Sequence, residues 1–275
     1  MRQLRGKGVV VTGAGRGIGR AIAARMAAEG ARVVVNDLDA DAAAAVAAAI
    51  GGHAIGGDAG SEAGVSSLIG GAREHLGRID IYFANAGVES GGGLETSEAD
   101  WASSMEINLM AHVRAARELV PLWVEEGGGR LVVTASAAGL LTLLGSPAYS
   151  ASKHAAVAFA EWLSASYRHR GVIVQAICPQ AVNTRMLDPS TPTGRLVAHD
   201  GVLEPEAVAE AVVSGLRDDR FLILPHPSVQ AHYELRAGQT DRWLAGMNRL
   251  QQRLDRETPR STSGRQSAAT EAEPA

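Results

Sequence analysis

Short apolar runs alternate with segments of helical periodicity along most of this chain, and this alternation limits the folds that it can adopt. Apolar runs bounded by glycine or polar residues are typical of strands that are buried on both faces of a sheet. The runs occupy residues 9–11, 33–35, 53–55, 79–83, 131–133, 172–177 and 221–224. We therefore predict an α/β, doubly wound (Rossmann) three-layer fold with a seven-stranded parallel sheet.

The pattern divides the chain into three regions. Residues 1–227 carry the alternating runs and are expected to form one domain. Residues 228–255 are expected to form a C-terminal helical extension that packs on this domain. Residues 256–275 contain almost no large apolar side chains, which predicts a disordered tail, because such a segment cannot offset the entropy lost on ordering.

One helical stripe stands out in the extension. Trp243, Met247, Leu250 and Leu254 recur at the spacing of a single helix face. We expect this stripe to pack on its own domain or on a partner subunit. A helix that lies on a membrane surface, or that recruits another protein, is the alternative.

Composition excludes several classes of partner. The 275 residues carry a formal net charge of −4, so we expect no nucleic-acid partner. Cys178 is the one cysteine, which rules out an internal disulfide, and the histidines lack paired metal-ligand spacing, so no metal site is expected. The apolar runs are too short to span a membrane and no signal-peptide pattern is visible, which indicates a cytoplasmic location.

The turn after the first apolar run is rich in glycine and precedes a helix. Glycines allow a sharp turn and a close approach of a pyrophosphate, whose oxygens would face the free N–H groups at the start of the helix. The residues of this turn that we expect to bind a dinucleotide are Gly13, Gly15, Arg16, Gly17, Ile18 and Gly19. Their spacing differs from the commonest dinucleotide fingerprint, so the turn indicates a phosphate site without proving one.

Asp37 follows the second apolar run, where a carboxylate can accept hydrogen bonds from ribose hydroxyls. The same carboxylate would repel a 2′-phosphate, which favours NAD over NADP. Arg16 favours the opposite choice, since a basic side chain in the turn could face that phosphate. We give Asp37 the greater weight.

Tyr149 and Lys153 lie four positions apart in a segment of helical periodicity, so both should point into the same site. A phenol has an ordinary pKa of about 10, and a nearby ammonium group lowers it. The spacing predicts a general acid/base pair, although an exposed helix face would show the same two residues.

These motifs together resemble the short-chain dehydrogenase/reductase family. The resemblance rests on residues 12–19, Asn85-Ala86-Gly87, Asn108, Ser136, Tyr149 and Lys153, in that order along residues 5–224. It implies that residues 1–227 form a dinucleotide-binding and catalytic domain.

The resemblance also implies a role for each catalytic residue. Tyr149 would exchange a proton with the substrate oxygen, which Ser136 would hold. Lys153 would lower the pKa of the tyrosine and contact the nicotinamide ribose, and Asn108 would support a proton relay. The other cofactor contacts that it implies are Leu38, Asp58, Ala59, Asn85, Ala86, Gly87, Pro179, Val182 and Thr184.

Two departures from the family pattern are visible. Gln180 stands where the family usually has glycine, and its side chain is expected to lie near the nicotinamide and the substrate. Residues 224–227 read Leu-Pro-His-Pro where many tetrameric members have an Asp-Gly-Gly turn, which leaves homodimer and homotetramer open. The resemblance implies a dimer contact through residues 98–124 and 147–170.

The resemblance implies an NAD(H)-dependent oxidoreductase that interconverts a secondary alcohol and a ketone. Leucines at positions 140, 141, 143 and 144 make the small-molecule substrate apolar if they face the site. An NADPH-dependent carbonyl reductase and a non-catalytic NAD-binding sensor or scaffold are the alternatives.

Overall fold

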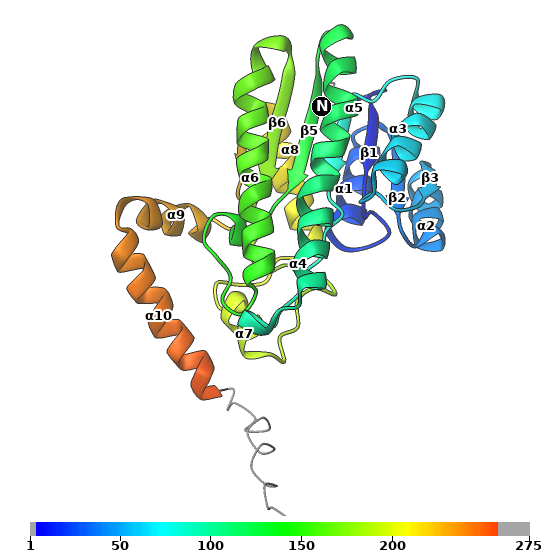
Figure 1. Ribbon diagram of the computed structural model, residues 1–275. Helices are drawn as coiled ribbons and strands as arrows, with labels where there is room; N and C mark the ends of the chain where they lie inside the picture. The colour runs from blue at the N-terminus through cyan, green and yellow to red at the C-terminus, as the bar shows by residue number, and fades with distance from the viewer. Residues whose placement is uncertain (1–3, 258–275) are drawn as a thin grey trace, which may run out of the picture.

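The computed structural model describes residues 4–257, and the seven predicted strands form one parallel sheet (Figure 1). Its strand order is β3-β2-β1-β4-β5-β6-β7, so the winding reverses between β1 and β4. The strands are β1 (Gly8–Val11), β2 (Arg32–Asp37), β3 (His53–Gly56), β4 (Ile81–Ala84), β5 (Gly129–Thr134), β6 (Val172–Ile177) and β7 (Leu222–Ile223). The predicted fold class is confirmed.

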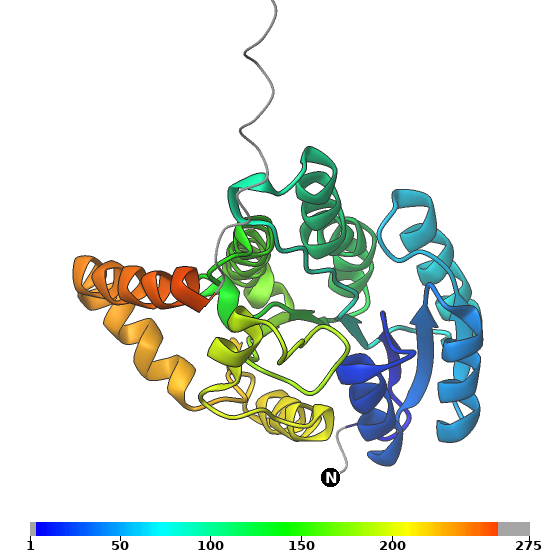
Figure 2. The same cartoon turned by 90° about the horizontal axis from the view of Figure 1, so that it is seen from below.

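Helices cover both faces of the sheet (Figures 1 and 2). One face packs against α1, α2 and α8, and the other against α3, α5 and α6. The helices are α1 (Gly17–Ala28), α2 (Ala40–Ile50), α3 (Glu62–Leu76), α4 (Glu98–Met105), α5 (Ala111–Glu125), α6 (Pro147–Tyr167), α7 (Pro192–Ala198), α8 (Pro205–Asp218), α9 (Ser228–Gly238) and α10 (Thr240–Glu257).

The central strand β1 explains why its sequence is apolar at every position. Val9 and Val11 pack into the cluster under α1 and α8, whereas Val10 packs into the cluster on the opposite face. All three side chains are fully buried. Because both faces are covered, no position on this strand is free to be polar.

The long helical region after β4 contains an irregular turn. Residues Glu106–Met110 form a π-helical turn between α4 and α5, so the region is neither one regular helix nor two separate helices. Asn108 lies in this turn and is fully buried. π-Turns widen the helix locally and often occur at functional sites.

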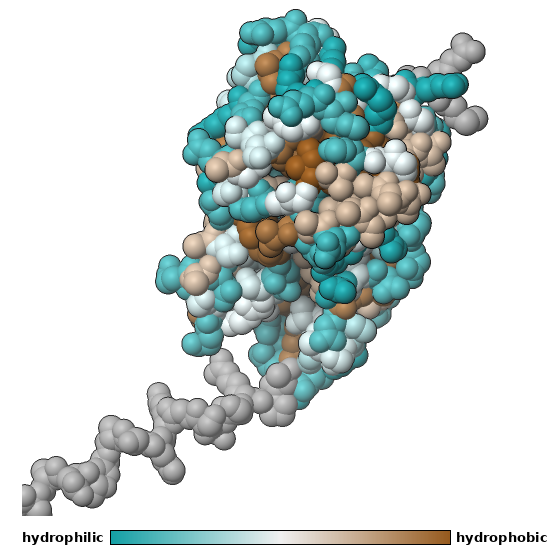
Figure 3. Space-filling model, turned by 90° about the vertical axis from the view of Figure 1, so that its right-hand side faces the viewer, coloured by the Kyte–Doolittle hydropathy of each residue, from teal (hydrophilic) through white to brown (hydrophobic). Residues whose placement is uncertain are grey.

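The outer surface over α2 and α3 is mostly hydrophilic (Figure 3). Exposed alanines of α2 contribute a weakly apolar area to this side of the molecule, namely Ala44, Ala45, Ala48 and Ala49. Within residues 4–257, the helices include none with the length and hydropathy needed to cross a membrane.

The C-terminal helices α9 and α10 form a V whose open side faces the body of the protein (Figure 2). The stripe residues Trp243, Met247, Leu250 and Leu254 are half-buried. The tail predicted over residues 256–275 falls almost entirely outside the described residues; of it, Arg256 and Glu257 belong to α10.

The start of β5 packs tightly against α5. A methyl group on Gly129 would lie 2.2 Å from the ring of Trp123, which is 1% exposed and whose Nε1 donates to the carbonyl of Ile79 over 2.7 Å. The indole ring cannot move away without losing that hydrogen bond. We expect Gly129→Ala to lower the free energy of unfolding by about 1–3 kcal/mol, measured by urea denaturation.

Gly70→Ala is the matched control. Gly70 lies within α3, and a methyl group there would meet nothing within 4 Å. Because alanine is the better helix former, this variant should be more stable than the wild type by roughly 0.5–1 kcal/mol. A Gly129→Ala protein as stable as the wild type would show that the indole ring is not held as described.

Candidate active site

A cleft of about 2190 Å³ runs along the carboxyl ends of the strands and collects nearly all the predicted site residues. In open α/β sheets, ligands bind at this edge where the strand order reverses. The predicted residues that line it are Gly13, Arg16, Gly17, Ile18, Gly19, Asp37, Leu38, Asp58, Ala59, Asn85, Ala86, Gly87, Ser136, Tyr149, Lys153, Pro179, Gln180, Val182 and Thr184. Of the predicted set, only Gly15 and Asn108 do not line it: Gly15 is half-exposed beside it and Asn108 is fully buried.

Two of the lining residues have side chains that are already occupied by other contacts. The side chain of Val182 is 5% exposed and packs in the hydrophobic core. The carboxylate of Asp58 accepts hydrogen bonds from the N–H groups of Gly60 and Ser61, and these bonds lower its pKa.

The glycine turn needs glycine for two separate reasons. Gly13 and Gly17 have φ angles of 59° and 54°, in the left-handed region that favours glycine. Gly19 has no room for a side chain, because a methyl group there would lie 2.3 Å from the carbonyl oxygen of Gly13. The turn therefore keeps the start of α1 close to the end of β1.

The start of α1 suits an anionic group. No side chain caps its first N–H groups, and no acidic residue lies in its first turn. Uncapped N–H groups and the helix dipole together attract a phosphate. These features, together with the narrow glycine turn, fit the pyrophosphate of a dinucleotide.

Asp37 lies at the end of β2 and is already held in place. Its carboxylate accepts hydrogen bonds from the N–H groups of Gly15, over 2.8 Å, and Asp39, over 3.1 Å. Arg16 does not face it; the Arg16 guanidinium forms an ion pair with Asp39 over 2.9 Å. The cleft therefore presents a fixed carboxylate, and the one cation of the glycine turn has its own partner.

Tyr149 and Lys153 point into the same part of the cleft, as their spacing predicted. The Lys153 Nζ atom lies 5.7 Å from the centre of the Tyr149 ring, and both residues are buried. Burial raises the pKa of the Tyr149 phenol to about 12, and the nearby Ser136 hydroxyl opposes that rise. We expected the ammonium group to lower this pKa; that prediction is wrong, because the loss of water around the buried phenol is the largest effect and raises the pKa.

Lys153 is itself strongly affected by burial. Its side chain is among the buried residues, at 3% exposure, and burial lowers the pKa of its ammonium group to about 8. The Nζ atom donates a hydrogen bond to the carbonyl of Thr134 over 2.8 Å. A methyl group on Gly87 would lie 3.3 Å from Nζ, so this glycine keeps space open around the ammonium.

The Asn108 side chain forms hydrogen bonds to two other segments of the chain. Its Oδ1 accepts from the N–H of Val88 over 2.9 Å, and its Nδ2 donates to the carbonyl of the same residue over 2.9 Å. Nδ2 also donates to the Ser152 hydroxyl over 3.0 Å. The side chain therefore fixes the segment after Gly87 to helix α6, directly behind Lys153.

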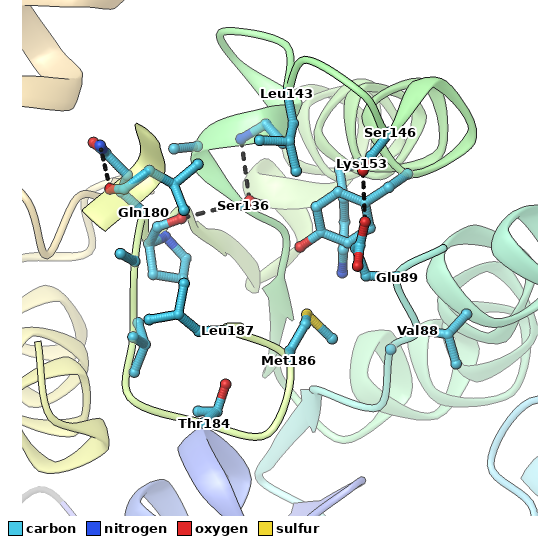
Figure 4. Close-up of a pocket in the computed structure, with 18 of the residues that line it drawn as sticks. Val88, Glu89, Ser136, Leu143, Ser146, Lys153, Gln180, Thr184, Met186 and Leu187 are labelled. Carbon is cyan, nitrogen blue, oxygen red and sulfur yellow. Dashed lines mark hydrogen bonds between the residues drawn. The ribbon is translucent and has the colours of Figure 1, made fainter. Parts of the chain in front are cut away.

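Ser136 and Gln180 form a neighbouring part of the cleft wall, and Figure 4 shows Ser136 between Gln180 on one side and Lys153 and Glu89 on the other. The Ser136 hydroxyl accepts from the N–H of Ala138 over 3.1 Å. The Gln180 side chain donates from Nε2 to the carbonyl of Val197 over 3.1 Å, which connects this wall to α7. The N–H of Gln180 donates to Nδ1 of His226, over 3.1 Å.

Three site residues were not found from the sequence. Glu89 accepts a 2.6 Å hydrogen bond from Ser146 and lines the cleft (Figure 4), and, in addition to burial, its charge raises the pKa of the Tyr149 phenol. His226 supports Gln180, and the only sequence signal for it was the unusual turn at residues 224–227. His112 is buried beside Lys153, and burial lowers the pKa of its imidazole to about 3.

The comparisons with known proteins agree with this geometry. The family described as short chain dehydrogenase matches residues 7–194. The 1-deoxy-11-beta-hydroxypentalenate dehydrogenase of Streptomyces exfoliatus is 38% identical over 249 residues, which cover 87% of this chain and 90% of that protein. An uncharacterized NAD-dependent oxidoreductase of Mycobacterium tuberculosis is 34% identical over 72% of this chain and 79% of its own length.

A solved structure supports the same assignment. The crystal structure of a short chain dehydrogenase/reductase from Burkholderia phymatum in complex with NAD superposes with a TM-score of 0.78. It is 31% identical and covers 88% of this chain and 96% of the other. The family match and this structure define the protein as an oxidoreductase with the NAD-binding Rossmann fold. The chain belongs to the short-chain dehydrogenase/reductase family, as its motifs led us to expect.

The buried ammonium group gives a pH-dependent stability. The pKa of Lys153 is about 8 in the folded protein and 10.5 in its ordinary state, so the unfolded chain binds more protons between these values. The buried Lys153 ammonium therefore lowers the free energy of unfolding by its full amount below pH 8, and this destabilisation becomes smaller as the pH rises toward 10.5. Lys153→Met should gain stability relative to the wild type at pH 7, by at most about 3 kcal/mol, and this gain should shrink toward pH 10.5.

The measurement is urea denaturation of both proteins from pH 7 to 10.5. Lys7→Met is the control, because Lys7 is half-exposed and pairs with Asp80 on the surface. The difference in the free energy of unfolding between Lys7→Met and the wild type should not decline in the same way from pH 7 to 10.5. A Lys153→Met difference that stays flat across this pH range would contradict the assigned pKa.

Proposed function

We propose that the protein is an NAD(H)-dependent oxidoreductase that interconverts a secondary alcohol and a ketone. The observation that carries this proposal is the convergence of Ser136, Tyr149 and Lys153 in one cleft with the glycine turn of α1. A non-catalytic nucleotide-binding protein would need the glycine turn alone. The apolar side chains beside the three residues support an apolar substrate.

Each side chain has a role that its surroundings support. The Tyr149 phenol holds its proton at neutral pH, since burial raises its pKa to about 12, and it can donate that proton to a carbonyl oxygen. The Ser136 hydroxyl stabilises the charge that develops on the same oxygen. Lys153, fixed by the Thr134 carbonyl, supplies positive charge beneath the phenol.

The cofactor would supply hydride transfer, and the chain would supply its position. Gly13, Gly17 and Gly19 would hold the pyrophosphate against the start of α1, and Asp37 would accept from the adenosine ribose hydroxyls. Asn108 would support the proton relay by holding Val88 against α6. Each of these contacts uses a group that already lines or supports the cleft.

The ion pair of Arg16 with Asp39 supports NAD over NADP. Arg16 was the single argument for a 2′-phosphate, and its charge is engaged elsewhere. The relative named as NAD-dependent and the similar structure with bound NAD support the same choice.

Tyr149→Phe tests the chemistry. The variant keeps the ring and loses the transferable proton, so we expect turnover to fall at least a thousandfold while the dissociation constant for NADH changes less than threefold. A panel of secondary alcohols and ketones, followed by cofactor absorbance, measures turnover, and calorimetry measures binding. A wild-type protein that binds NADH but turns over no substrate on this panel would favour the non-catalytic alternative.

Asp37→Asn tests the cofactor. Removing the carboxylate removes its repulsion of a 2′-phosphate, so the ratio of NADPH to NADH affinity should rise at least tenfold. Asp41→Asn is the matched control, because Asp41 lies in the first turn of α2 and is exposed outside the cleft. Wild-type protein that binds NADPH as tightly as NADH in calorimetry would disprove the proposed preference.

A further inference from the structure

The apolar stripe of α10 lines the same cleft as Tyr149 and Ser136. Trp243, Met247, Leu250 and Leu254 all face this cleft, although they lie about a hundred residues beyond Tyr149 in the sequence. None of them is buried, and none is fully exposed. The stripe spans three turns of helix, or about 16 Å at 1.5 Å per residue.

α10 is held in place at both ends. At its start, Trp243 packs on the core cluster that contains Val229, and its ring lies 5.9 Å from that of His232 on α9. At its end, Glu257 pairs with Arg195 of α7 over 2.9 Å. Figure 2 shows α10 running from its junction with α9 back toward the body of the protein, and its stripe residues line one side of the cleft.

α9 connects α10 to the catalytic wall, by which we mean the segment from Ser136 to Tyr149. The Arg236 guanidinium donates a hydrogen bond to the carbonyl of Leu140 over 2.8 Å. Leu140 lies between Ser136 and Tyr149, in the segment that carries the two proposed catalytic groups. The position of α10 is thus coupled to that of the catalytic wall through α9.

The loops that line the rest of this part of the cleft carry apolar side chains as well, among polar ones such as Arg185, Asp188 and Asp200. Figure 4 shows Leu143 on one side of the pocket and Met186 and Leu187 on the loop opposite. The apolar side chains that line this part of the cleft are Leu143, Leu144, Met186, Leu187, Leu196 and Val197. Met186 is 48% exposed and the others are half-buried. A cleft with this much exposed apolar surface fits an apolar ligand better than water.

We propose that the α10 stripe is the distal wall of the substrate site, and that the substrate is a secondary alcohol or ketone on a large hydrocarbon skeleton. The carbinol lies at Tyr149 and the hydrocarbon extends outward between α7 and the stripe. This inference rests on the proposed alcohol/ketone chemistry. The occupant is the substrate because the stripe and the catalytic residues share one continuous cleft.

A series of 2-alkanols and 2-alkanones of increasing length tests the inference. Each added methylene that reaches the stripe should raise kcat/KM by about fourfold, since burying a CH₂ group contributes about 0.8 kcal/mol. The increase should continue well beyond six carbons and then level off. A kcat/KM that is flat with length, or that falls for the longer members, would overturn the inference.

Substitutions on opposite faces of α10 separate the stripe from the helix as a whole. Leu250→Asp places a carboxylate on the stripe, and the ratio of kcat/KM for the longest to the shortest substrate should fall at least tenfold. Leu244→Asp is the matched control, because Leu244 is 57% exposed on the other face of α10. That ratio should be unchanged in the control, and equal losses in both variants would overturn the inference.

A binding measurement keeps the inference independent of turnover. Dodecan-2-ol should change the tryptophan fluorescence of the wild-type protein without cofactor, and Trp243→Phe should remove most of that change. If the panel shows no turnover at any length, the proposed chemistry fails while this signal still supports the apolar channel. If the signal persists in Trp243→Phe and Leu250→Asp, the channel is wrong.

Sedimentation separates the other occupants of the stripe. With the stripe as a substrate wall, Leu250→Asp and wild-type protein should sediment alike. A change of oligomer size in Leu250→Asp, with no change in length preference, would mean that a second copy of the chain covers the stripe. Binding of the wild type, but not of Leu250→Asp, to phosphatidylcholine vesicles would mean that the stripe meets a membrane, and would likewise overturn the inference.

Discussion

The cleft depends on a small hydrogen-bond cluster that joins the carboxyl ends of three strands. The Thr12 hydroxyl accepts from the N–H groups of Asn85 and Ala86 over 2.9 and 3.0 Å, and the Asn85 amide donates to the Thr12 carbonyl over 2.9 Å. The Thr134 hydroxyl donates to Asn85 Oδ1 over 3.0 Å. The Thr134 carbonyl also accepts a hydrogen bond from Lys153. One hydrogen-bond cluster therefore positions both the glycine turn and the lysine of the proposed catalytic site.

The fold and the main site could be predicted because both depend on local patterns. Strands buried on both faces must be apolar at every position, so β1 was visible from its valines. The helical periodicity around Tyr149 and Lys153 was visible because the segment that forms α6, Pro147–Tyr167, has no interior glycine or proline. Parallel topology then brings the ends of the strands to one edge, which places Asp37 and Ser136 in one cleft even though 99 positions separate them.

What the sequence could not provide depends on burial and on contacts between distant segments. The Tyr149 pKa moves upward because the phenol loses water, and no spacing of residues reports that loss. Gln180 turns toward α7 because Val197 offers a carbonyl, and His226 meets it only in the folded chain. The α10 stripe was visible in the sequence as one face of a helix. The surface that it approaches could not be predicted, because α7 is short and its sequence has no clear helical pattern.

The π-turn that carries Asn108 depends more on the number of residues in it than on the identity of most of them. A π-turn closes with i→i+5 hydrogen bonds and holds one residue more than an α-helical turn, so deleting one residue from Glu106–Met110 would let α4 and α5 join as one regular α-helix. Leu119 and Trp123 would stay on the sheet, whereas Asn108 would lose the widened turn that brings its side chain to Val88 and Ser152. Deletions should therefore be rare in this turn among natural variants of the chain, even where the exposed side chains around Asn108 are exchanged.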